Sequence, residues 1–196
     1  MTRGSLARWA FAAVITVCLS GSCSTDDGDE SPSTGRRTDG PLRMVPEGGY
    51  SHSLPVGAEF TDGFWVLRLD GDEPATIDDV RIEASNGLEQ LGVMLAAPAR
   101  PIASVQVDES WPPRHRYLPK RVLVDAIGAE ITPARDGWEL LIGMKAAARG
   151  YLQRDGVTVD YTVGDKAYTA YLPISVFICT DKKYEEDGVC PTPKGF

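Results

Sequence analysis

Residues 156–179 read GVTVDYTVGDKAYTAYLPISVFIC, and they contain the clearest strand pattern in the chain. Every second residue from Val157 to Val163 is apolar, with polar residues between, which is typical of a strand that buries one face. Gly164 and the aspartate after it then predict a tight turn, and the alternation resumes on the return. Pro173 lacks a backbone N–H, so we expect the returning strand to lie at a sheet edge or to bulge there.

Shorter segments upstream show related patterns. Trp138 shares one face of a strand over 138–144 with three apolar residues, so we expect its indole to be buried between sheets. Residues 64–69 predict a strand that a turn closes. The segments 77–84 and 91–95, joined by Asn86-Gly87, predict a hairpin over 77–96. Residues 103–107 and 122–124 are weaker strand candidates.

The chain therefore reads as seven or eight short strands separated by turns, without a convincing amphipathic helix. Its 20 glycines and 14 prolines suit many turns. This pattern predicts an all-β fold in which two sheets pack as a sandwich.

From about Pro74 to Cys179 the chain resembles the immunoglobulin-like domains of uncharacterised actinobacterial lipoproteins. PATIDDVRI, GLEQLGVML, DGWELLIGMKA and residues 156–179 carry this resemblance. It implies an immunoglobulin-like sandwich and an exported location, and it implies no activity. The Cys–Trp–Cys arrangement of antibody domains is absent, because no cysteine lies between Cys23 and Cys179.

The N-terminus has the layout of a secretory signal: a basic start, an apolar run over 9–19, and small residues before Cys23. The apolar run is too short to span a membrane. Small residues followed by cysteine resemble the lipobox of bacterial lipoproteins, although Ser20 stands where that family usually has leucine. The resemblance implies cleavage before Cys23 and acylation of that cysteine, which would anchor the protein in the cell membrane on its extracytoplasmic face. Plain secretion with a free thiol is the alternative.

Three segments follow from this reading: a lipoprotein signal peptide over 1–22, a flexible acidic tether over 23–49, and a sandwich domain over 50–196. The tether is predicted because the segment has few apolar residues and no periodicity. Its acidic residues lack the ligand spacing of an EF-hand.

The chain is acidic, with 20 Lys and Arg against 28 Asp and Glu. Loss of the signal removes two arginines and changes the net charge from −8 to −10. This charge argues against nucleic-acid binding, which depends on cations at phosphates. We expect its partners to be the membrane, through the lipid on Cys23, and a protein of the cell envelope.

Two cysteines remain once the signal is removed and Cys23 is lipidated. An even pair in an exported protein predicts a disulfide between Cys179 and Cys190, which would staple the C-terminal tail to the last strand. A redox or metal-binding pair is the alternative, but their separation of 11 positions fits neither motif.

The segment from Trp111 to Arg121 concentrates aromatic and basic residues in an acidic protein. We hypothesise that a partner docks there, with Trp111 and Tyr117 as anchors and with Arg114 and Arg116 contacting acidic groups. In the alternative, the aromatic residues fold inward and the arginines pair with the protein's own carboxylates.

No motif of a hydrolase, zinc protease or nucleotide-binding enzyme occurs in the sequence. The predicted function is a non-enzymatic interaction or envelope-associated module, with no cofactor and no bound metal. Two alternatives stay open. One is a copper carrier that uses His52, His115, Met94 and Met144, and the other is an enzyme with an unrecognised site.

Overall fold

The computed structural model describes residues 39–45, 48–98, 107–114, 123–186 and 189–191. Contacts divide the chain into residues 1–35 and 36–196, and every described residue belongs to the second unit. The predicted signal peptide, Cys23 and the tether up to residue 38 therefore lie outside the described residues.

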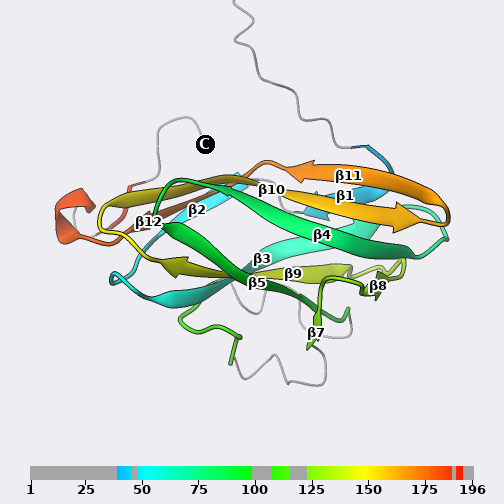
Figure 1. Ribbon diagram of the computed structural model, residues 1–196, viewed down its shortest axis with the longest axis horizontal. Helices are drawn as coiled ribbons and strands as arrows, with labels where there is room; N and C mark the ends of the chain where they lie inside the picture. The colour runs from blue at the N-terminus through cyan, green and yellow to red at the C-terminus, as the bar shows by residue number, and fades with distance from the viewer. Residues whose placement is uncertain (1–38, 46–47, 99–106, 115–122, 187–188, 192–196) are drawn as a thin grey trace, which may run out of the picture. The chain divides into compact units, whose positions relative to one another are not determined.

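The described residues form two sheets that face each other, as Figure 1 shows. Sheet A has the strand order β1-β3-β9-β5-β7, with β6 also paired to β3. Its strands are β1 (Leu42–Val45), β3 (Glu59–Leu69), β5 (Leu88–Ala96), β6 (Val107–Asp108), β7 (Leu123–Asp125) and β9 (Trp138–Ala146).

Sheet B has the order β2-β12-β10-β4-β8, with β11 also paired to β10. Its strands are β2 (Gly48–Ser53), β4 (Ala75–Ala84), β8 (Glu130–Ile131), β10 (Tyr151–Val163), β11 (Lys166–Leu172) and β12 (Ile174–Cys179). Most pairs in both sheets are antiparallel, whereas β2 and β12 run parallel. A short 3-10 turn over Lys182–Tyr184 follows the last strand.

The hydrophobic core lies between the two sheets. Both sheets contribute apolar side chains with no measurable exposure, among them Phe60, Trp65, Leu95, Leu140, Ile142, Val157, Val159, Tyr161, Val176 and Ile178. The predicted all-β, two-sheet sandwich is therefore confirmed.

The segment 156–179 folds as its pattern predicts. Residues 157–163 of β10 pair with β11 through a tight turn in which Val163 lies opposite Lys166. Pro173 separates β11 from β12, and both strands pair with β10. The register shifts by one residue across this break, so the predicted irregularity at Pro173 is confirmed.

The predicted hairpin over 77–96 is wrong. Strand β4 belongs to sheet B and β5 to sheet A, so the turn after Ala84 carries the chain from one sheet to the other (Figure 1). Gly87 adopts a positive φ of 94°, as a tight turn requires. Alternation shows which residues face the core, but it cannot show whether two strands lie side by side or opposite each other. Here Val80 and Val93 both face the interior, from opposite sheets.

The predicted boundary of the tether at residue 49 is also wrong, because β1 and the start of β2 precede it. Leu42 is completely buried, and its backbone N–H donates to the Tyr161 hydroxyl at 3.1 Å. That hydroxyl donates in turn to the carbonyl oxygen of Asp39 at 2.9 Å. Gly40 has φ 75°, and a Cβ on it would lie 2.4 Å from the same hydroxyl oxygen. The segment that leads into β1 can therefore pack against Tyr161 in this way only if residue 40 is glycine.

Trp138 is half-buried at the first position of β9, where its Nε1 donates to the carbonyl oxygen of Thr132 at 3.0 Å. The prediction of full burial is wrong because the strand begins at the rim of the sandwich. The predicted face is nevertheless right, since Leu140, Ile142 and Met144 are completely buried in the core. Among the described tryptophans, the completely buried indole is that of Trp65.

The predicted disulfide between Cys179 and Cys190 is present, and both residues are almost completely buried. Their Cα atoms are 5.4 Å apart. The bond ties the tail after β12 to the end of that strand, and the Tyr151 hydroxyl adds a hydrogen bond of 3.2 Å to the carbonyl oxygen of Pro191.

Candidate partner-binding groove

The structure describes only the first part of the predicted partner-binding segment. Trp111 is half-buried and Arg114 is exposed, whereas His115, Arg116 and Tyr117 lie outside the described residues. The described part, 107–114, begins as β6, which pairs with the edge of β3. The chain then passes onto the outer face of sheet A, the face turned away from the core, where Trp111 contacts β9 and β5. The Thr61 Oγ1 donates to the carbonyl oxygen of Ser110 at 2.6 Å.

Trp111 lies flat on the backbone of sheet A because two glycines make room for it. Gly92 of β5 and Gly143 of β9 are opposite each other in the strand register. A Cβ added to Gly143 would lie 2.2 Å from the Trp111 Cδ2, and one added to Gly92 would lie 3.0 Å from its Cζ2. An aromatic ring that covers glycine in a strand is a known way of stabilising that strand.

Other residues on the outer face of sheet A are also buried. Ala96 and Leu141 have no measurable exposure, and Met94 and Leu123 pack against them. Glu139 is on the same face and is also completely buried. The outer face of sheet A is therefore a second, smaller apolar layer, with Trp111 beside it.

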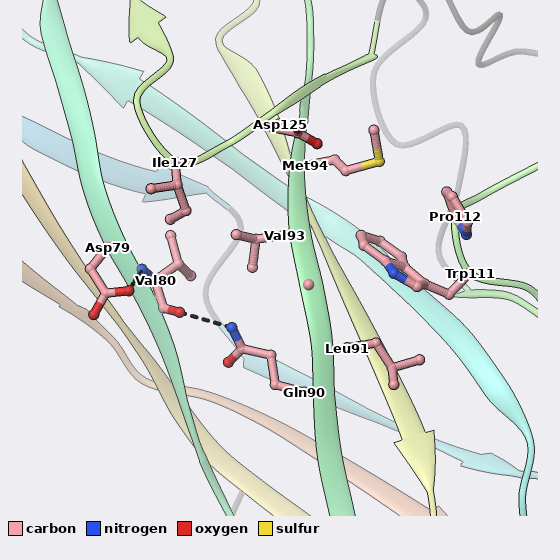
Figure 2. Close-up of a pocket in the computed structure, with 11 residues that line it drawn as sticks. Asp79, Val80, Gln90, Leu91, Val93, Met94, Trp111, Pro112, Asp125 and Ile127 are labelled. Carbon is pink, nitrogen blue, oxygen red and sulfur yellow. Dashed lines mark hydrogen bonds between the residues drawn. The ribbon is translucent and has the colours of Figure 1, made fainter.

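A hollow of about 570 Å³ wraps around the exposed edge of β5. Figure 2 shows Val93 and Gln90 on the β4 side of that strand, and Met94, Leu91 and Trp111 on the other side. Leu91 is the extra residue of a bulge, since Gln90 pairs with Met144 and Gly92 with Gly143. The bulge leaves Leu91 at the rim with 36% of its surface exposed.

Gln90 closes the gap between the two sheets at this hollow. Its Nε2 donates to the carbonyl oxygen of Val80 at 2.9 Å, and its Oε1 accepts from the backbone N–H of Ile82 at 3.0 Å (Figure 2 shows the first bond). The side-chain amide thus makes the two bonds that a neighbouring strand would make to the edge of β4. An edge satisfied in this way is less open to pairing with another chain.

Two further hollows adjoin the first. One of about 370 Å³ shares Asp125 and Ile127 with it and reaches Glu130 and Trp138. The other, of about 460 Å³, shares Met94 and Pro112 with the first and reaches Arg114. We call the 570 and 370 Å³ hollows together the β5 groove.

Among the described residues, an ion pair lies in the interior between the sheets. The Arg154 Nη1 of β10 lies 2.7 Å from the Asp62 Oδ2 of β3, and both side chains are completely buried. The Trp65 Nε1 donates to both oxygens of the same carboxylate, at 2.7 and 2.8 Å. The ring of Tyr50 stacks on Trp65 with 6.5 Å between ring centroids. Burial of the Tyr50 hydroxyl, with a smaller contribution from the Asp62 charge, raises its pKa well above the usual value. None of the three hollows described above is lined by these four residues.

The structure separates the two methionines considered as metal ligands from sequence. Met144 is completely buried in the core, whereas Met94 lies on the outer face of the same sheet. The two methionines therefore cannot bind one ion. His52 is in β2 of the other sheet, and His115 is outside the described residues. Within the ranges that the structure describes, no group of three His, Cys, Asp or Glu side chains could hold a metal ion.

The sequence singles out Trp111 by its aromatic and basic neighbours, but the pattern does not predict the groove beside it. The available signal was Gly92 and Gly143, each of which interrupts an apolar strand where a larger residue is expected. In the described part of the chain, no helix is long and apolar enough to cross a membrane.

No protein-family model matches the chain, and no curated protein matches it. Among solved structures, the chain is similar to a family 123 glycoside hydrolase from Clostridium perfringens, described in connection with glycolipid glycan hydrolysis. The identity is 15% and the TM-score 0.30, over 68% of this chain and 23% of the hydrolase chain. A likeness at this TM-score carries no argument about fold or function.

Proposed function

We propose that the protein is a lipid-anchored, non-enzymatic interaction module on the extracytoplasmic face of the cell membrane, and that its partner binds at the β5 groove. In this proposal the sandwich is of the immunoglobulin-like type, and acylated Cys23 holds it at the membrane. The crossover that carries Arg114, Arg116 and Tyr117 is the second contact region for the partner.

The observation that carries the proposal is the grouping of exposed apolar side chains. Leu91, Val124 and Ile127 are exposed by 36, 44 and 49%. They are three of the six large hydrophobic residues with substantial exposure among the described residues, and all three line the β5 groove. Single exposed apolar residues need no explanation, but a group of them around a hollow is typical of a binding surface.

Site-specific photocrosslinking in living cells tests the binding surface. A benzophenone amino acid at Ile127 should form a discrete crosslinked product, because this side chain is 49% exposed in the groove. The same amino acid at Asp165, an exposed turn residue between β10 and β11, is the matched control. Equal products from both positions, or none from either, would contradict binding at the groove.

A separate experiment tests the anchor. Cys23→Ala should release the protein from the membrane fraction or block removal of the signal. The intact mass of the wild-type protein from that fraction should include acyl chains. A wild-type protein that is soluble and begins at another residue would rule out the lipid anchor.

A further inference from the structure

We infer that the β5 groove binds a peptide segment in which lysine or arginine lies next to an apolar side chain. This inference rests on the proposed function and specifies the chemistry of the partner.

The charged side chains among the described residues that line the groove are all acidic. Its ionisable lining residues are Asp79, Asp125 and Glu130. Asp79 is already paired with Arg81. Asp125 and Glu130 are exposed, and no basic side chain among the described residues lies within ion-pair distance of either. A cation that enters the groove would meet two carboxylates that no described basic side chain pairs.

The apolar residues lie beside these carboxylates. Val124 precedes Asp125 in β7, and Ile127 is two residues after it. Trp111 borders the first hollow and Trp138 the second, each half-buried. Indole rings attract lysine and arginine through the charge distribution of the ring as well as by apolar contact. A ligand that carries both a cation and an apolar group therefore fits better than one that carries either alone.

The protein's own charge argues against two other occupants. The chain has a net charge of −8, so a second copy or a nucleic acid would bring further negative charge to an acidic groove. The hollows are two adjoining depressions of about 570 and 370 Å³ at a strand edge. Depressions of this size each accept a few side chains, which suits a short linear segment of a protein.

Fluorescence anisotropy with designed peptides tests the inference. The probe is a fluorescein-labelled peptide of sequence Gly-Lys-Leu-Lys-Gly-Lys-Leu-Lys-Gly, titrated with the full chain carrying Cys23→Ala at low salt. Two comparison peptides replace the leucines with serine or the lysines with glutamate. We expect the lysine–leucine peptide to bind. The serine peptide should bind at least roughly fivefold more weakly than it, and the glutamate peptide should not bind.

Protein variants locate the binding. Asp125→Asn/Glu130→Gln should weaken binding of the lysine–leucine peptide by roughly tenfold, an effect that shrinks as salt is raised. Asp72→Asn/Asp165→Asn removes the same charge from two exposed turns and should change the dissociation constant less than about twofold. Ile127→Ser should weaken binding about threefold without changing its salt dependence.

Three results would overturn the inference: no binding of the lysine–leucine peptide, equal binding of the serine peptide, or equal effects of the two double variants. If crosslinking at Ile127 succeeds while the peptide fails to bind, the groove binds a partner of other chemistry. If both experiments fail, the proposed function fails with the inference.

Discussion

The outer faces of the two sheets differ although the sheets share one core. On sheet A, Leu141 and Ala96 are completely buried, and Trp111 lies flat on the two glycines. On sheet B, the outer face carries a polar network in which Arg81 pairs with Asp160 at 2.7 Å and with Asp79. Thr169 also donates to Asp160, at 2.8 Å.

Each outer face nevertheless places one aromatic ring over a glycine. Tyr171 of β11 lies over Gly156 of β10, where an added Cβ would come within 2.5 Å of the Tyr171 hydroxyl oxygen. On sheet A the ring comes from a crossover segment, whereas on sheet B it comes from the neighbouring strand. On sheet A the contact between ring and glycine therefore holds a separate segment against the sheet. On sheet B it only fills the space above the glycine.

The largest expected effect concerns the ion pair that links the two sheets. Arg154→Met should lower the free energy of unfolding by about 3–5 kcal/mol, because it leaves the buried Asp62 carboxylate without its cation. Arg154→Met/Asp62→Asn should cost less than Arg154→Met alone, since the amide keeps an acceptor for Trp65 without a charge. Denaturant titration of both variants measures the difference, and a double variant that is no more stable than Arg154→Met would contradict this account of the pair.

Next in size are the two aromatic rings. Trp111→Ala should cost about 3 kcal/mol, because the indole covers two strands and the crossover depends on it. Tyr171→Ala should cost about 1 kcal/mol, because its ring is half-buried on a solvated face. Chemical denaturation of both variants measures the comparison. Equal losses would mean that the two rings contribute equally to the free energy of unfolding.

The glycines beneath the rings sharpen the same comparison. Gly143→Ala should cost about 2–3 kcal/mol, because the new methyl group meets the packed body of the Trp111 indole. Gly156→Ala should cost less than about 1 kcal/mol, because the hydroxyl end of Tyr171 can swing into solvent. Thermal unfolding of the two variants distinguishes them, and a larger loss for Gly156→Ala would reverse our interpretation of the faces.

The smallest effect depends on pH and reports on the interior. Burial raises the pKa of Tyr50 above its unfolded value near 10, so the folded protein keeps this proton where the unfolded chain releases it. The contribution of this hydroxyl to the free energy of unfolding is therefore fully present below about pH 10. It falls as the pH rises further, by at most about 1.4 kcal/mol per pH unit. Tyr50→Phe should flatten the alkaline decline measured by urea denaturation from pH 9 to 11. An unchanged slope would show that this hydroxyl contributes nothing.

The sequence could have indicated more about β9 than we inferred from it. The alternation over 138–144 predicted one core-facing side, whereas all residues from Glu139 to Met144 are buried. A near-continuous apolar run indicates a strand covered on both faces. LLIGM in that strand carried the signal, and its glycine marked where an aromatic ring would lie.

Which of the two sheets each strand joins is harder to predict from the sequence. Asn86-Gly87 predicts a reversal of the chain, and the reversal is present. The pairing is absent because β4 takes its neighbour from β10 and β5 takes its own from β9, far along the chain. Local residues cannot specify such partners, since the free energy comes from contacts between residues 43 to 88 positions apart in the chain.

The sequence by itself determined the strands with one polar face, the turn at Gly164, the break at Pro173 and the pairing of the last two cysteines. Each depends on residues close together in the chain: side-chain alternation, a missing N–H, or a short loop between thiols. Only the tertiary structure decided that Trp111 lies on Gly92 and Gly143, and that Asp125 and Glu130 flank an apolar groove. These features require distant segments to meet, and their positions are set by the packing of the two sheets as a whole.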